Sequence, residues 1–434
     1  MHHQGRNGAT FGDVVRVREF RAIWLADAQS IAGDQIARVS LAILVFQRTG
    51  STGLTALVYA LTYLPAIVGG ALLASFADRF PRRDVMVYCD LIRAALYGVV
   101  AIPHMPLGVM CVLIVLAVLS TAPFSAAESA MLPTILAEHE LYVVGAGLRA
   151  TTAQLAQLFG FAIGGVLVGA IGVQWGLGID AATFVVSAIL VLRFVQNRPV
   201  PTRTDDLGAE PQRRRMLDGA RTVFGDARLR SLMLLAWLAA FYVVPEGLAP
   251  SYVAAIGGGT AAVGVIMAAD PAGSAIGAAL FVRLVPPHIR ARLMGVLAVA
   301  AGLPLILCGL KPGIEVSVLL IAATGLCSAF QIQASTTFMR VVPDHHRGQA
   351  FGLAQSGLIA VQGLGIALFG FIGDHVGAAH AIALAGAIGS ALAVVLGISW
   401  ERARRGRERA APEIPADAVR ERDTRMQRQA EDVS

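Results

Sequence analysis

The sequence predicts an all-α polytopic membrane protein, with twelve transmembrane helices in two six-helix halves. Of its 434 residues, 56% are hydrophobic and only 15% are charged, and the mean hydropathy is +0.66. A soluble chain of this length carries more charge. A membrane helix needs about 20 apolar residues. On that gauge the expected spans are 20–46, 53–77, 84–103, 107–131, 146–171, 175–195, 230–255, 260–284, 292–310, 315–338, 349–373 and 379–399.

The basic residues predict how these spans are oriented. With the N-terminus in the cytoplasm, nearly all of the 35 Lys and Arg residues fall on the cytoplasmic side, and the outer loops hold only Arg48 and Lys311. Lys and Arg are enriched in the cytoplasmic loops of membrane proteins. We therefore expect a multi-pass protein of the bacterial plasma (inner) membrane, with both termini in the cytoplasm.

A weak internal repeat divides the chain. Residues 70–86 are echoed by residues 277–294, and each segment precedes the third helix of its half. Internal repeats of this kind are typical of transporters built from two related bundles. The expected divisions are a cytoplasmic N-terminal segment (1–19), an N-terminal six-helix half (20–195), a central cytoplasmic loop with an amphipathic helix (196–229), a C-terminal six-helix half (230–399) and a disordered cytoplasmic tail (400–434).

A short basic turn joins the second and third expected helices. Its charged residues, and those of the helix that follows it, are Asp78, Arg79, Arg82, Arg83, Asp90 and Arg93. This stretch resembles the loop between helices 2 and 3 of the major facilitator superfamily, whose pattern is roughly Gly-x-Leu-Ala-Asp-Arg-x-Gly-Arg-Arg. The resemblance implies a gating motif, in which Asp90 and Arg93 form one charge network with Asp78 and Arg83 at the cytoplasmic gate.

Four other stretches resemble one branch of that superfamily. They are Gly33-Asp34 in the first helix, Asp180-Ala-Ala-Thr-Phe184 at the start of the sixth, residues 217–230 leading into the seventh, and residues 342–353 between the tenth and eleventh. Together they are similar to the bacterial exporters related to the enterobactin exporter and to macrolide efflux proteins. The resemblance implies efflux of a small molecule, usually driven by protons.

Charged residues inside the helices are the first candidates for the transport site. A charge at the bilayer centre costs about 2.5–3.5 kcal/mol on insertion scales, so it persists only where it is paired or faces a water-filled cavity. Asp34 and Arg38 lie one turn apart in the first helix. Asp34 is either a proton or substrate site that faces the cavity, or one half of an i,i+4 ion pair with Arg38.

Acidic residues elsewhere in the spans extend this set. Glu246 lies in the seventh helix at a depth similar to that of Asp34, and Asp270 precedes Pro271 near the middle of the eighth. We expect Asp270 to carry the proton and Asp34, with Arg38, to shape the substrate cavity. For Glu128 we favour a structural pair with a cytoplasmic arginine, and for Asp180 a helix cap.

Uncharged polar side chains complete the expected cavity. They are Gln154, Gln157, Gln331, Gln355 and Gln362. A small-molecule site combines an apolar wall with a few such groups. Hydrogen bonds between helices are an equally good interpretation of each of these glutamines.

The sequence therefore predicts a secondary active transporter, which exports a small amphipathic molecule such as a drug, an antibiotic or a siderophore in exchange for protons. Import or facilitated passage of a small metabolite is the alternative, followed by a non-transporting membrane receptor. We find no phosphate-binding loop and no cluster of catalytic or metal-ligating residues in the sequence, so we expect neither an enzyme nor a cofactor. The expected partners are the solute, protons and the lipid bilayer, with no nucleic acid, and the expected state is a monomer.

Overall fold

The computed structural model describes residues 10–65, 69, 79–198, 220–343 and 347–410. All regular structure within these residues is helical. Within this described part of the chain, nine helices, some of them broken in the middle, are long and apolar enough to cross a membrane: Leu107–Ile135, His139–Ile171, Val173–Phe194, Ala227–Ala255, Thr260–Leu284, Pro287–Cys308, Ile314–Val341, Arg347–Val376 and Ala378–Arg404. The predicted all-α membrane fold is confirmed.

The N-terminal half begins with a short helix that is sealed by a capping box between Thr10 and Asp13. Its helices are α1 (Phe11–Arg16), α2 (Arg18–Thr49), α3 (Thr52–Ala60), α5 (Arg82–Val100), α6 (Leu107–Leu119), α7 (Thr121–Ile135), α8 (His139–Ile171) and α9 (Val173–Phe194). Gly50 ends α2 in the left-handed region, which glycine adopts without strain. The Ser51 side chain then caps α3 by accepting a hydrogen bond from the amide of Leu54.

The C-terminal half is likewise built from long helices and broken ones. They are α11 (Ala227–Trp237), α12 (Ala239–Tyr242), α13 (Val244–Ala255), α14 (Thr260–Leu284), α15 (Pro287–Cys308), α16 (Ile314–Cys327), α17 (Phe330–Val341), α18 (Arg347–Val376) and α19 (Ala378–Ala410). Its first span is broken into α11, α12 and α13, and Pro245 and Pro250 both lie in the last of these pieces. Proline removes a backbone donor and interrupts the helical ladder, so irregular backbone is expected there.

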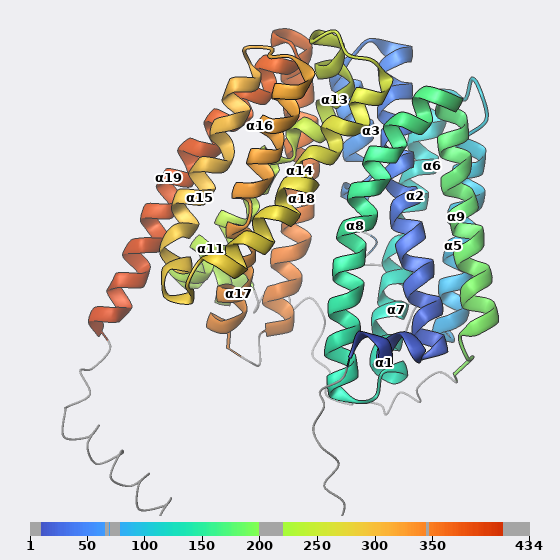
Figure 1. The fold of residues 1–434 in the computed structure, drawn as a ribbon, viewed down its shortest axis with the longest axis horizontal. Coiled ribbons are helices and arrows are strands. Elements are labelled where there is room, and N and C mark those ends of the chain that lie inside the picture. The colour runs from blue at the N-terminus through green and yellow to red at the C-terminus, as the bar shows by residue number, and fades with distance from the viewer. Residues whose placement is uncertain (1–9, 66–68, 70–78, 199–219, 344–346, 411–434) are drawn as a thin grey trace, which may run out of the picture.

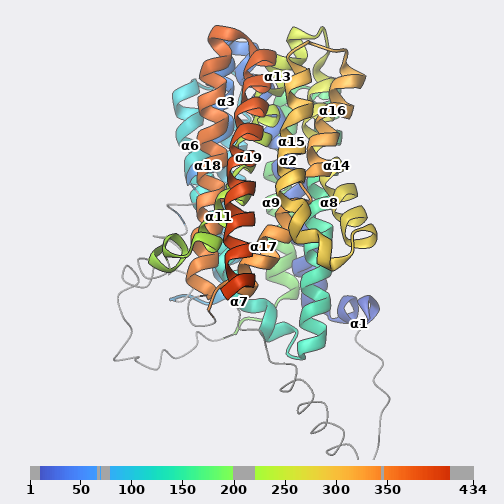
Figure 2. The same cartoon turned by 90° about the vertical axis from the view of Figure 1, so that its left-hand side faces the viewer.

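The two halves lie side by side and meet at one end (Figure 1). We call the end with α1 and the C-terminus of α19 the terminal end, and the other the opposite end. Helices α2, α3 and α8 of the N-terminal half pack on α13, α14 and α18 of the C-terminal half, and the most extensive of these contacts join α3 to α18 and α8 to α14. The halves diverge towards the terminal end (Figure 1), and α19 runs the length of the C-terminal half (Figure 2).

Glycines permit the closest approach between the halves. A Cβ atom added at Gly165 in α8 would lie 2.6 Å from the Cα atom of Gly264 in α14. Close helix packing through small residues is usual in membranes, because no hydrophobic effect drives helices together there. Large apolar side chains instead cover the outside of the bundle; Leu310, for example, is 79% exposed.

The structure differs from one expected boundary. Helix α19 continues to Ala410, so the first turns of the segment predicted as a disordered tail are helical. An ion pair at i,i+3 between Glu401 and Arg404 supports this extension. Residues 411–434 and residues 199–219 of the central loop lie outside the described residues, and the last part of the predicted amphipathic helix, residues 220–224, is helical.

Candidate transport site

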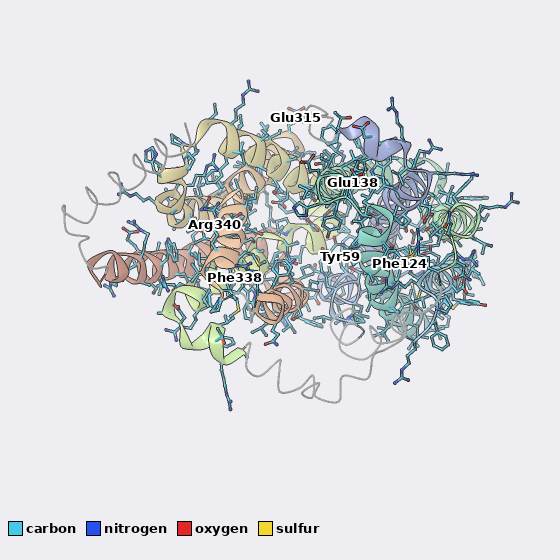
Figure 3. The ribbon with its side chains drawn as sticks, turned by 90° about the horizontal axis from the view of Figure 1, so that it is seen from below. Tyr59, Phe124, Glu138, Glu315, Phe338 and Arg340 are labelled. Carbon is cyan, nitrogen blue, oxygen red and sulfur yellow. The ribbon has the colours of Figure 1, made fainter. Side chains whose placement is uncertain are left out.

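A hydrogen-bonded group links the two halves inside the bundle. The hydroxyl of Tyr59 in α3 donates to Glu246 Oε2 in α13 at 2.9 Å, and the Tyr63 hydroxyl lies 3.5 Å from the same oxygen. Arg38 Nη1 in turn donates to the Tyr63 hydroxyl at 3.2 Å. Glu246 is only 5% exposed, so these partners replace the water that its carboxylate would otherwise bind. Figure 3 shows Tyr59 between the halves, with Phe124 on one side and Phe338 on the other.

A cavity of about 240 Å³ lies next to this group. The side chains that line it are Asp34, Arg38, Thr62, Tyr63, Arg93, Tyr97, Ala117, Val118, Thr121 and Ile359. Ile359 belongs to α18, so both halves contribute to the wall. Two residues predicted for the substrate site, Asp34 and Arg38, therefore border one cavity.

Asp34 and Arg38 do not form the ion pair that was the alternative interpretation. The Arg38 guanidinium lies over the ring of Tyr63, 4.7 Å from its centroid, and bonds to its hydroxyl. Stacking on an aromatic face is a favourable position for Arg in a site with little water. Asp34, which is half-buried, is thereby left facing the cavity.

The pair formed by Asp90 and Arg93 belongs to the same region of the N-terminal half. The two side chains are ion-paired, and the Ser187 hydroxyl donates to Asp90 Oδ2 at 2.6 Å. The Arg93 guanidinium is sandwiched between Phe124 and Phe184, at 4.7 and 4.2 Å from the ring centroids. Helix α5 begins at Arg82, so both charges lie two to three turns inside it and away from the predicted gate.

The basic turn does not form the single network that the resemblance implied, as far as the described residues extend. Arg82 donates to the backbone carbonyl of Ala130 in α7 at 2.8 Å, and Arg83 is bound to Asp84. Arg79 is exposed, and Asp78 lies outside the described residues. Arg82 thus ties the start of α5 to α7.

Glu128 has the arginine partner that was expected for it. Arg149 Nη2 in α8 donates to Glu128 Oε2 at 2.6 Å, and Arg149 Nε donates to Asp27 Oδ2 at 2.8 Å. One guanidinium therefore holds carboxylates from α2 and α7 to α8. The planar fork of Arg is suited to two carboxylates at once, and this triad stabilises the N-terminal half.

Asp270 lies in α14 and has no hydrogen-bond partner among the described residues. Its Oδ1 atom is buried and unbonded, and Glu246 is the charged group that acts on it electrostatically. Helix α14 packs on α13, the helix that carries Glu246. Within the described residues, no group of three or more His, Cys, Asp or Glu side chains has the geometry of a metal site.

The predicted glutamines divide between two places. Gln331 and Gln355 border a small cavity of about 40 Å³ between α11, α17 and α18. Gln154 is exposed and lies three turns before Gly165 on the same face of α8, the face that meets the other half further along. Gln157 and Gln362 are half-buried.

Sequence reasoning missed the outermost contact between the halves. Asp374, near the end of α18, accepts hydrogen bonds from the Gly53 amide at 3.0 Å and from the Ser51 hydroxyl at 3.0 Å. These groups form the N-terminus of α3, where the helix dipole favours a negative charge. The cap at Ser51 is visible in the sequence, but its partner in the other half is not.

The fold and the site together define a membrane transporter made of two related bundles around a central polar cavity. A family model described as Major Facilitator Superfamily matches residues 23–311, and the chain belongs to that family. The chain is 25% identical over 388 residues to macrolide efflux protein A of Streptococcus pyogenes, which covers 87% of this chain and 95% of that protein. It is 27% identical over 369 residues to the enterobactin exporter EntS of Salmonella choleraesuis, covering 82% and 85%.

Solved structures share the same fold. The nucleoside transporter NupG aligns with a TM-score of 0.66 at 15% identity, over 89% of this chain and 98% of that one. A bacterial homologue of the human lysosomal transporter Spinster, in an inward-facing and occupied conformation, aligns with a TM-score of 0.68 at 15% identity, over 89% and 96%. The resemblance to the superfamily, and to its exporter branch, is confirmed.

Proposed function

We propose that the protein exports a small amphipathic molecule from the bacterial cytoplasm in exchange for protons, by alternating access. The observation that carries this proposal is the bond from Tyr59 to Glu246. A buried carboxylate that is shared between two halves changes partners when the halves separate, and its affinity for protons changes with its partners. Such a group links the conformation of the transporter to a proton.

The orientation of the chain follows from its arginines. We assign the terminal end to the cytoplasm, because the positive-inside rule favours it. The halves meet at the opposite end through Asp374 and Gly165. On this assignment the structure corresponds to a state that is closed to the outside, with the cavity reached from the cytoplasm.

The relatives support the class of solute. The two named proteins are a macrolide efflux protein and an enterobactin exporter. We therefore propose efflux of an amphipathic molecule in the size range of these solutes. The cavity beside Asp34 combines aromatic and apolar walls with three charged side chains, Asp34, Arg38 and Arg93, and would have to widen as the halves move to take such a solute.

Separate roles are proposed for the acids. Asp34 and Arg38 border the cavity and bind the solute, whereas Asp270 carries the proton in the C-terminal half.

The five glutamines contribute polar contacts along the path of the solute. The turn from Asp78 to Arg83 controls closure at the cytoplasmic side, and the unit that works is a monomer in the plasma membrane.

The test is uptake of labelled macrolides and siderophores into inside-out membrane vesicles, with and without a proton gradient. The account predicts accumulation that collapses when a protonophore is added. Vesicles with the Glu246→Gln variant should lose proton-driven accumulation. Vesicles with the Glu315→Gln variant should keep it, because Glu315 is an exposed acid at the opposite end. Accumulation only in right-side-out vesicles would indicate an importer, and no movement of any solute under any gradient would indicate a receptor.

A further inference from the structure

Among the described residues of the N-terminal half, Asp180 and Asp90 are the acids with 0% exposure, and of the two only Asp90 is ion-paired. Asp180 lies in the second turn of α9, which begins at Val173, so it is not the helix cap that the sequence favoured. Its side chain is 0% exposed, and both carboxyl oxygens are buried without a hydrogen-bond partner. A buried polar group without a partner is rare in folded proteins and calls for an explanation.

The carboxyl group of Asp180 lies directly against helix α2. A Cβ atom at Gly33 would come within 2.8 Å of Asp180 Oδ1 and 2.5 Å of Thr183 Oγ1, so only glycine fits there. Gly33 of α2 therefore contacts Asp180 and Thr183 of α9, and Asp34, the next residue of α2, borders the cavity.

Nearby donors and cations already have other partners. The Thr183 hydroxyl donates its proton to the backbone carbonyl of Asp180 at 2.7 Å. From α5, Arg93 is ion-paired with Asp90, and from α2, Arg38 is bound to Tyr63. Tyr97 of α5 also faces this region, and its hydroxyl makes no hydrogen bond with Asp180.

Helix α8 also packs on α9 but adds no counter-charge. Its titratable residues are His139, Glu140, Tyr142 and Arg149, all in its first turns. Arg149 is committed to Asp27 and Glu128. An unpaired carboxylate in such a place costs several kcal/mol, and a second carboxylate, Asp34, increases this cost.

We propose that Asp180 and Asp34 form a proton-binding site within the N-terminal half, in which the two carboxyl groups together hold one proton. In the state seen here the proton is on Asp180. Transfer breaks the O–H bond of Asp180 and forms an O–H bond on Asp34, which borders the 240 Å³ cavity and releases the proton to water there. The inference rests on the proposed function only in taking the proton as the coupling ion.

This site gives each half an acid that can be neutral in the membrane. Asp270 would serve the C-terminal half, and the Asp34–Asp180 site would serve the N-terminal half. Asp180 itself has no exposed surface, so a proton held there leaves through a neighbouring group, and Asp34 is the acid of this region that borders the cavity. Binding of a solute at Asp34 would therefore control release of this proton.

The test is infrared difference spectroscopy of the purified full-length protein at neutral pH, with exchange into heavy water. A protonated carboxylic acid has a C=O stretch separate from that of a carboxylate. Subtraction of the Asp180→Asn spectrum from the wild-type spectrum should reveal one carboxylic-acid band. Glu315→Gln is the matched control and should remove no such band, because an exposed glutamate is ionised at neutral pH.

A second variant separates the two acids. Asp34→Asn should retain the Asp180 band at a shifted frequency, because only the neighbour of the acid has changed. Failure of Asp180→Asn to remove a carboxylic-acid band, or loss of the band in Asp34→Asn, would overturn the assignment. If Asp180→Asn does not insert, Asp180→Glu takes its place: it keeps a carboxylic acid at the site, and the band should move in frequency, whereas an unmoved band would overturn the assignment. This readout does not depend on transport, so the proposed function and the proton site can fail separately.

Discussion

The hydroxyl of Tyr59 in the N-terminal half donates a hydrogen bond of 2.9 Å to the carboxylate of Glu246 in the C-terminal half. Both residues are almost fully buried, at 1% and 5% exposure. The bond joins helices that must separate at the opposite end if the cavity is to open there. It therefore belongs to one conformation of the transport cycle only.

Replacement of Tyr59 by Phe should weaken this conformation. A hydrogen bond to a charged group contributes about 1.5–3 kcal/mol, so the ratio of closed to open opposite ends should fall by roughly tenfold to a hundredfold. Distances between spin labels at His104 and Lys311, in exposed loops of the two halves, would measure this ratio. Tyr88→Phe, at a tyrosine that is 67% exposed, is the control, and equal distance distributions in both variants would contradict the prediction.

Asp374→Ala should loosen the outermost contact. The carboxylate caps the N-terminus of α3, and loss of a cap costs about 1 kcal/mol. Hydrogen exchange of the amides in residues 51–55 should become roughly fivefold faster. Glu315→Ala removes an exposed acid at the start of α16 and should leave that exchange unchanged. An unaltered rate in Asp374→Ala would show that this contact does not hold the halves together.

Gly165→Ala should prevent the close approach of α8 and α14. The added methyl group would lie 2.6 Å from backbone atoms of Gly264, and backbone cannot move away as a side chain can. A cysteine at Thr260, beside this junction, should then react at least several-fold faster with a membrane-impermeant reagent from outside. Gly178→Ala, where a Cβ atom meets nothing within 4 Å, should have no effect. Equal reactivity in both variants would refute the role given to Gly165.

Asp78→Asn tests the gate. We expect the protein to insert normally but to transport more slowly, because the turn loses an acid that can pair with its arginines while the cavity is intact. Cysteine accessibility from each side would report the change in conformational balance. Glu138→Gln, an exposed acid at the terminal end, is the comparison. Unchanged transport together with unchanged accessibility would remove the gating role.

The fold could be predicted from the sequence because the bilayer imposes it. Runs of apolar residues can be recognised from local sequence alone. In the described residues, the structure has helices where these runs were expected. Asp34 and Arg38 could be chosen as candidates for the same reason, since a charge within an apolar run is visible without knowledge of the fold.

The partners of these charges could not be predicted. Arg38 is bound to Tyr63 rather than to Asp34, because the ring that covers the guanidinium comes from another helix. Tyr59 and Glu246 belong to different halves, and no spacing relates them. Asp180 was interpreted as a cap because the apolar run seemed to begin near it, whereas α9 begins directly after Gly172. Side-chain partners between helices depend on packing, which a single sequence does not reveal.

Asp270→Asn and Asp34→Asn should fail in different ways. If Asp270 carries the proton, its replacement should abolish uphill accumulation but leave solute binding and downhill exchange. Asp34→Asn should weaken solute binding itself, because Asp34 borders the cavity. Binding by tryptophan fluorescence and exchange in proteoliposomes would separate these effects. Normal uphill pumping by Asp270→Asn would shift the proton role to Glu246 or to the Asp34–Asp180 site.

The central claim is the exchange of a solute for protons. The most direct measurement is simultaneous recording of macrolide flux and internal pH in proteoliposomes that contain the purified protein. The account predicts that macrolide moving out of the cytoplasmic compartment drives protons in the other direction, and that an imposed proton gradient drives macrolide uphill. Macrolide movement with no accompanying proton flux, and with no response to an imposed gradient, would contradict it.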